Sequence, residues 1–259
     1  MDGVIERKVG TNIILEIREL SDELKRKIKE QLVEICHGEY GLTSGVKYHS
    51  YDETLMELVN YRIPNRRNGA IGAMGELLLN VLIREFTDMR IVSPFFNLEE
   101  RSVKKGFDII AVDSHKDLWI IESKAGRLGI HLTNSTDKVC ERLQVAKNDL
   151  DRRLNEDNSQ LWLNAINSVR SALDDNSEKK TIVNILNDSS NSCLSDNKNV
   201  VLGGTVFSVF DSVIDEVRLE ELYKSILDSR KFLKLRLIAI QKATYQAIIE
   251  YLKSLICEV

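Results

Sequence analysis

Apolar and polar positions along the chain follow two periodicities. Asn12–Ile17 is apolar and rich in β-branched residues, which predicts a strand. From Ser21, a residue type that caps helices, apolar positions recur at helical spacing as far as Cys36. Further helices are predicted over residues 52–61, 71–86, 137–153, 160–173, 179–186, 215–227 and 244–256, strands over 107–112, 118–121, 200–210 and 233–240, and loops over 37–50 and 187–199. Helices that alternate with strands predict an α/β fold with a mixed sheet flanked by helices.

The chain is expected to form a single domain over residues 1–259. Pro64 and Pro94 are its two prolines, and no Gly/Ser-rich linker marks a boundary. We expect a core at about residues 69–150, a helical insert at about 155–198, and C-terminal strand and helix elements over 199–259.

Composition narrows the class of protein. With 43% hydrophobic and 29% charged residues, the chain can bury a sizeable core. No stretch approaches the ~20 apolar residues of a membrane span, and the first residues lack the layout of a signal peptide. The four cysteines are isolated, which is typical of thiols in a reducing compartment. We therefore expect a cytoplasmic protein, and the net charge of −4 does not exclude a nuclease with a local basic groove.

The segments 107–112 and 118–121 carry a hairpin signal, because a short polar stretch separates two apolar runs. A turn centred on His115 places Asp108 opposite Glu122. Side chains alternate along a strand, so Lys124 lies on the same face as Glu122. Both faces of the hairpin are apolar, which indicates a sheet covered on both sides.

Three ionisable side chains at one end of a buried hairpin face need compensation. Two close carboxylates repel each other unless a cation lies between them, and Mg²⁺ prefers such oxygen ligands. A lysine beside them can act on a metal-bound water or on the charge that develops on a phosphate. The pattern indicates phosphodiester hydrolysis; the alternative is a plain salt bridge between Lys124 and the two acids. Other acidic-x-Lys triplets, such as Glu23-Leu24-Lys25, fall on predicted solvated helices or loops.

Glu76 is a fourth candidate. It lies on the predicted helix over residues 71–86, next to the small residues Gly72, Ala73 and Gly75. An acid on such a small-residue, partly apolar stripe is unusual for a solvated position, and glycines there let the backbone of the helix approach the sheet closely. The alternative is an ordinary surface glutamate.

These residues resemble the PD-(D/E)XK nuclease superfamily, whose fold is that of restriction endonucleases. The matching parts are, in order, Gly75-Glu76, Gly106-Phe107-Asp108 and Glu122-Ser123-Lys124. The resemblance implies that Asp108 and Glu122 hold Mg²⁺ or Mn²⁺, that Lys124 positions or deprotonates the attacking water, and that Glu76 supports the metal site. Some members add a glutamine on the next helix; Gln144 is similar, although Asn148 replaces the aromatic residue that often follows.

The whole chain also resembles the HamA family, the nuclease subunits of the Hachiman anti-phage defence system. That resemblance implies a DNA nuclease held in check by a superfamily 2 helicase subunit (HamB-like). Arg66, Arg67, Lys105 and Arg127 flank the predicted site and are candidate contacts to DNA phosphates, although basic loop residues are often merely solvated. Two alternatives stay open: a non-catalytic subunit that regulates a helicase, and a repair or junction nuclease of the same fold.

Overall fold

The computed structural model describes residues 1–96, 106–129, 134–156, 159–191 and 194–257. Its strands are β1 (Val4–Val9), β2 (Asn12–Ile17), β3 (Arg90–Ile91), β4 (Ile109–Val112), β5 (Leu118–Arg127), β6 (Asn199–Phe207) and β7 (Lys234–Lys242). Its helices are α1 (Asp22–His37), α2 (Glu39–Thr43), α3 (Tyr51–Glu57), α4 (Arg67–Phe86), α5 (Ser135–Asn155), α6 (Ser159–Ala172), α7 (Ser177–Ser190), α8 (Glu216–Asp228) and α9 (Gln246–Ile256), with short 3₁₀ or π turns at η1 (Lys47–His49), η2 (Leu58–Arg62) and η3 (Ser195–Asn197). No helix among these described residues is long and apolar enough to cross a membrane.

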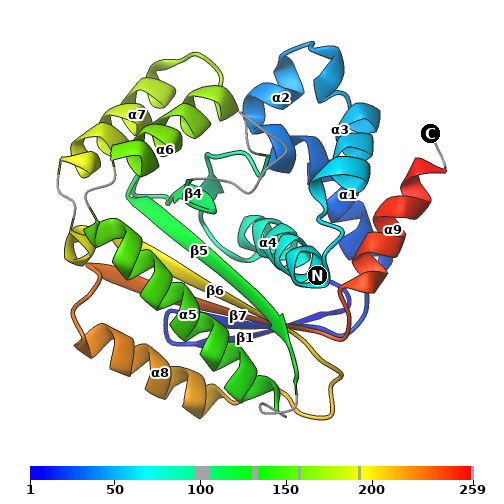
Figure 1. The fold of residues 1–259 in the computed structure, drawn as a ribbon, viewed down its shortest axis with the longest axis vertical. Helices are drawn as coiled ribbons and strands as arrows, with labels where there is room; N and C mark the ends of the chain where they lie inside the picture. The colour runs from blue at the N-terminus through cyan, green and yellow to red at the C-terminus, as the bar shows by residue number, and fades with distance from the viewer. Residues whose placement is uncertain (97–105, 130–133, 157–158, 192–193, 258–259) are drawn as a thin grey trace.

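The described strands form one seven-stranded mixed sheet in the order β1-β2-β7-β6-β5-β4-β3. β2, β7, β6 and β5 run parallel, and antiparallel pairs close the two edges. Figure 1 shows helices on both sides: α1, α4 and α9 on one, α5 and α8 on the other. Each layer covers its own hydrophobic core. The predicted restriction-endonuclease-like α/β architecture is confirmed.

The hairpin forms in the predicted register. Ile109 pairs with Ile121 and Val112 with Leu118. Asp113 fixes the turn locally, since its carboxylate accepts hydrogen bonds from the backbone N–H of Asp117 at 2.9 Å and from the indole N–H of Trp119 at 2.9 Å. β5 continues beyond the predicted strand to Arg127 because it pairs with β6 from Trp119 to Arg127.

Five short elements of the described chain lie outside the predicted pattern: β1, β3, α2, η1 and η3. β1 is an edge strand whose middle is the charged run Glu6-Arg7-Lys8, so it lacks the alternation of apolar and polar residues that would mark a strand. α2 and η1 lie within residues 37–50, which the glycine content predicted to be loop. Both are single short turns, too short to show a hydrophobic period.

α4 and α5 both run antiparallel to β5, one on each face. A Cβ at Gly75 of α4 would lie 2.4 Å from the Ala125 side chain, and one at Gly203 would lie 2.4 Å from Leu79. Gly203 pairs with Ser123 of β5. From Gly75 to Leu79, α4 therefore passes from the level of Ala125 to the level of Ser123, which is the direction opposite to β5. The neighbouring Gly204 faces Leu143 of α5 instead.

Residues 155–198, the predicted helical insert, contain α6, α7 and η3. The insert packs directly against the hairpin, because the Trp162 ring of α6 meets the Phe107 ring edge-on at 5.2 Å. Phe107 precedes Asp108, so the insert supports the strand that carries the first predicted acid.

Candidate active site

The hairpin brings Asp108, Glu122 and Lys124 together, as its register predicts. Asp108 lies just before β4, and its Oδ2 accepts a hydrogen bond from the backbone N–H of Ser123 at 2.8 Å. Lys124 Nζ donates to Glu122 Oε1 at 2.6 Å. All three predicted side chains therefore gather at the end of the hairpin, on the face covered by α5.

Two further charged residues complete the cluster, and both come from α5. Arg153 donates from one guanidinium nitrogen to Glu122 Oε2 at 3.0 Å and from the other to the carbonyl oxygen of Gly106. Asp149 Oδ2 lies 3.0 Å from Lys124 Nζ. Sequence reasoning did not identify either residue, because no local motif marks them.

Helix and strand geometry explains why these pairs match. Four residues of a helix rise about 6 Å, and two residues of a strand rise about 6.6 Å. Because α5 runs antiparallel to β5, the step from Asp149 to Arg153 matches the step from Lys124 back to Glu122. Asp149 of α5 therefore faces Lys124 of β5, and one helical turn later Arg153 faces Glu122.

Glu122 is fully buried, with no exposed side-chain surface. Burial, and then the nearby Asp108 carboxylate, raise the pKa of Glu122, while Lys124 and Arg153 oppose that rise. Hydrogen bonds from Lys124 and Arg153 reach both of its carboxylate oxygens. Burying the Glu122 carboxylate costs desolvation free energy, and the two cations Lys124 and Arg153 compensate that cost.

Lys124 and Asp149 form the more exposed half of the cluster. Burial alone lowers the pKa of Lys124, but Glu122, Asp108 and Asp149 outweigh it and raise that pKa. Partial burial raises the pKa of Asp149, but hydrogen bonds from Lys124 and Arg152 outweigh it and lower the pKa to about 2. Lys124 thus bridges two carboxylates as a cation.

The donor set fits a hard divalent cation. Among the described residues, no group of three or more His, Cys, Asp or Glu side chains is arranged to hold a metal ion. Mg²⁺ needs fewer protein ligands, since one or two carboxylates usually hold it together with water and substrate phosphates. Asp108 and Glu122 supply such oxygens, and Lys124 already places a positive charge between Glu122 and Asp149. A metal ion there would replace part of the Lys124 and Arg153 pairing.

Comparison with known proteins adds a second line of evidence. The HamA family model matches residues 7–256. The chain belongs to the HamA family. Membership makes it a protein of the Hachiman defence system and confirms the resemblance seen in the sequence. A search of curated proteins finds no match.

The fourth acid of this HamA-family protein lies on the other side of the sheet. Glu76 is half-buried on α4, directly after Gly75. Gly75 packs against Ala125, and Ala125 points to the opposite face of β5 from Lys124. The role of Glu76 in supporting a metal therefore stays a prediction.

Three of the four predicted DNA contacts lie toward one end of the sheet. Arg66 and Arg67 are exposed at the N-terminus of α4, and Arg127 is exposed at the carboxyl end of β5. Because α4 runs antiparallel to β5, these two termini lie toward the same end of the sheet. Lys105, the fourth predicted contact, lies outside the described residues.

Gln144 of this HamA-family chain makes its side-chain hydrogen bond within α5. Its side-chain amide donates to Asn148 Oδ1 at 3.1 Å, one helical turn further on and in an exposed position. The side chains that α5 directs to the cluster are those of Asp149 and Arg153. The structure thus gives no support to a site role for Gln144.

Proposed function

We propose that this HamA-family protein is a metal-dependent DNA nuclease, the effector of a Hachiman defence complex. The observation that carries the proposal is the meeting of Asp108, Glu122 and Lys124 at the end of one hairpin. A structural salt bridge needs one acid and one base. Here a buried acid, two further carboxylates, a lysine and an arginine share one position, an arrangement that suits metal-assisted phosphodiester hydrolysis.

Each described residue has a task in this reaction. Asp108 and Glu122 would hold Mg²⁺ or Mn²⁺, which supplies Lewis-acid polarisation of the phosphate and lowers the pKa of bound water. Lys124 holds its ammonium group beside them, where it can orient the attacking water or stabilise charge on the phosphate. Arg153 keeps Glu122 in position by clamping it to Gly106.

DNA and a helicase subunit are the partners of this proposal. Arg66, Arg67 and Arg127 offer exposed positive charge at the carboxyl end of β5, which suits contacts to DNA phosphates. Membership in the HamA family supports a Hachiman complex, and the partner we propose is the superfamily 2 helicase (HamB-like) that restrains the nuclease.

The test is cleavage of plasmid DNA with Mg²⁺, Mn²⁺ or EDTA, by the purified protein alone and with its helicase and ATP. We expect metal-dependent cutting that Lys124→Ala and Asp108→Asn reduce at least a hundredfold while the melting curve stays cooperative. Lys25→Ala is the matched control, because Lys25 closes an acidic-x-Lys triplet on the solvated face of α1. Equal cutting by all four proteins would refute the mechanism.

One observation favours a second candidate, a non-catalytic subunit that regulates a helicase. Lys124 and Arg153 already compensate Glu122 without a metal ion. That candidate predicts no cleavage under any activating condition, and no binding of Mn²⁺ measured by calorimetry. A repair or junction nuclease would instead cut branched DNA in preference to plasmid.

A further inference from the structure

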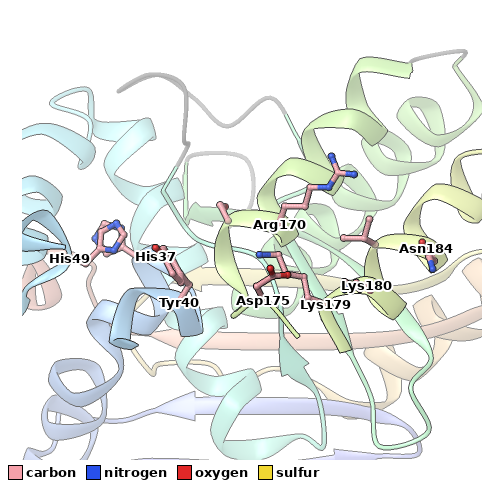
Figure 2. Close-up of a pocket in the computed structure, with 10 residues that line it drawn as sticks. His37, Tyr40, His49, Arg170, Asp175, Lys179, Lys180 and Asn184 are labelled. Carbon is pink, nitrogen blue, oxygen red and sulfur yellow. The ribbon is translucent and has the colours of Figure 1, made fainter. Parts of the chain in front are cut away.

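A second concave site lies between the N-terminal helices and the helical insert. Its cavity has a volume of about 750 Å³, within the range of ligand pockets in proteins. One wall comes from the ends of α1 and η1 and from α2, and the other from α6 and α7. Figure 2 shows His37, His49 and Tyr40 on one wall, facing the polar side chains of the other. We call this cavity the insert groove.

The two walls are fixed to each other. Gly38 (φ +81°) packs so tightly on α6 that a Cβ there would lie 2.4 Å from the Cα of Ala172. Thr43 Oγ1 donates to Asp174 Oδ1 at 2.7 Å across the same junction. The insert groove is therefore preformed, and a ligand would not have to assemble it.

The first wall is a set of flat rings. His37 and His49 lie with ring centroids 4.3 Å apart, and Tyr40 meets His49 edge-on at 6.2 Å. Hydrogen bonds orient both imidazoles, His37 to Thr54 at 3.0 Å and His49 to Ser44 at 2.8 Å. Tyr40 has 41% of its surface exposed. Such a surface suits a planar, aromatic ligand group.

The second wall is cationic. Arg170, Lys179 and Lys180 line it, against the single carboxylate of Asp175. Lys179 and Lys180 lie in the first turn of α7, where the helix dipole makes a positive charge unfavourable. Lys179 has a structural role as well, since its ammonium group donates to the carbonyl oxygen of Leu173 at 3.0 Å, just after α6. Helix stability does not explain the second lysine, Lys180. An anion held at this wall would gain from the three side chains and from the positive end of α7.

We propose that the insert groove binds a nucleotide, with its phosphate on Arg170, Lys179 and Lys180 and its base against Tyr40 and His49. The chemistry is that of a nucleotide unit, whether free or part of a DNA strand. None of the described residues that line the groove belongs to the Asp108–Glu122–Lys124 cluster, so the two sites can fail independently.

The test measures binding rather than cleavage. Fluorescence anisotropy with a labelled 12-nucleotide oligothymidylate measures binding of a DNA strand. Calorimetry with ATP and with dTMP measures binding of a free nucleotide. The protein carries Lys124→Ala, so that the DNA stays intact. Lys180→Glu and Arg170→Glu should each weaken binding about tenfold, and Lys180→Ala should lower the slope of log Kd against log salt by about 1.

Matched variants distinguish binding at the insert groove from nonspecific electrostatic attraction to the whole protein. Lys253→Glu makes the same charge change at an exposed position of α9 and should leave the Kd unchanged. Tyr40→Ala should weaken binding and Tyr40→Phe should retain it, because stacking needs the ring and not the hydroxyl. Binding of neither oligonucleotide nor free nucleotide, or equal weakening by Lys253→Glu and Lys180→Glu, would overturn the proposal.

Discussion

Asp149 Oδ2 lies 3.0 Å from Lys124 Nζ, joining the middle of α5 to the end of the hairpin. Lys124 at the same time donates to Glu122 Oε1 at 2.6 Å. One ammonium group thus ties a helix carboxylate to a buried strand carboxylate. The proposed active site therefore depends on how α5 is placed as much as on the hairpin.

Replacing Asp149 tests that dependence. Asp149→Asn leaves Lys124 paired with Glu122 alone, so the ammonium group is less well oriented. We expect the cleavage rate to fall about tenfold at saturating Mg²⁺, since small misplacements of reacting groups are costly. The Mg²⁺ concentration at half-maximal rate should stay unchanged if Asp149 positions Lys124. An increase in that concentration would instead make Asp149 a metal ligand. Glu156→Gln is the control, because Glu156 is an exposed carboxylate on the C-terminal side of α5.

Replacing Arg153 should destabilise the fold. Arg153→Met leaves one oxygen of buried Glu122 without its cation, which should lower the free energy of unfolding by about 2–4 kcal/mol. Mg²⁺ should then raise the melting temperature of the variant more than that of the natural protein, because a divalent ion restores the missing charge. Thermal melts with and without Mg²⁺ measure this. Arg152→Met, which removes an exposed guanidinium from the same helix, should melt like the natural protein in both conditions.

Two glycines of α4 form a matched pair. A Cβ at Gly75 would lie 2.4 Å from the Ala125 side chain, so Gly75→Ala should push α4 off β5 and cost about 1–3 kcal/mol. At Gly72 no heavy atom lies within 4 Å of the added carbon, so Gly72→Ala should stabilise the helix by about 0.5–1 kcal/mol. Urea unfolding measures both, and opposite signs are expected. A loss of stability in both variants would contradict the close packing.

The stability of the protein should fall in mild acid because of His37. Burial, then the neighbouring His49 and Arg62, lower the pKa of His37 from 6.5 to about 4. The fold favours the neutral ring, so its contribution is complete above pH 6.5 and is lost as the pH falls toward 4. Melting temperatures across that range should drop less in His37→Gln than in the natural protein. His115→Gln, at an exposed turn residue, should leave the pH profile unaltered.

Interactions close in sequence made the hairpin predictable. The polar turn, the period of two and the apolar faces are all properties of residues 107–124, and Asp113 holds the turn through its own neighbours. Asp108, Glu122 and Lys124 therefore share a face for local reasons. The helices α1, α4 and α5 were predictable in the same way, from regular apolar spacing.

The partners of these residues were not predictable. Asp149 and Arg153 reach the hairpin only because α5 crosses β5 in an antiparallel direction at one longitudinal position, which Leu143 sets by packing on Gly204. The insert groove likewise joins segments that lie far apart in the chain, such as Tyr40 and Lys180. β1 was missed because a charged edge strand takes its structure from its partner β2.

The sequence by itself determined the α/β class, the hairpin register and the acid–acid–lysine set, because periodicity and turn chemistry act over a few residues. The tertiary structure alone decided which charges compensate that set, which face Glu76 occupies and where a second site forms. Those features depend on how helices pack across the sheet, and packing distances are set by contacts between segments that no local pattern connects.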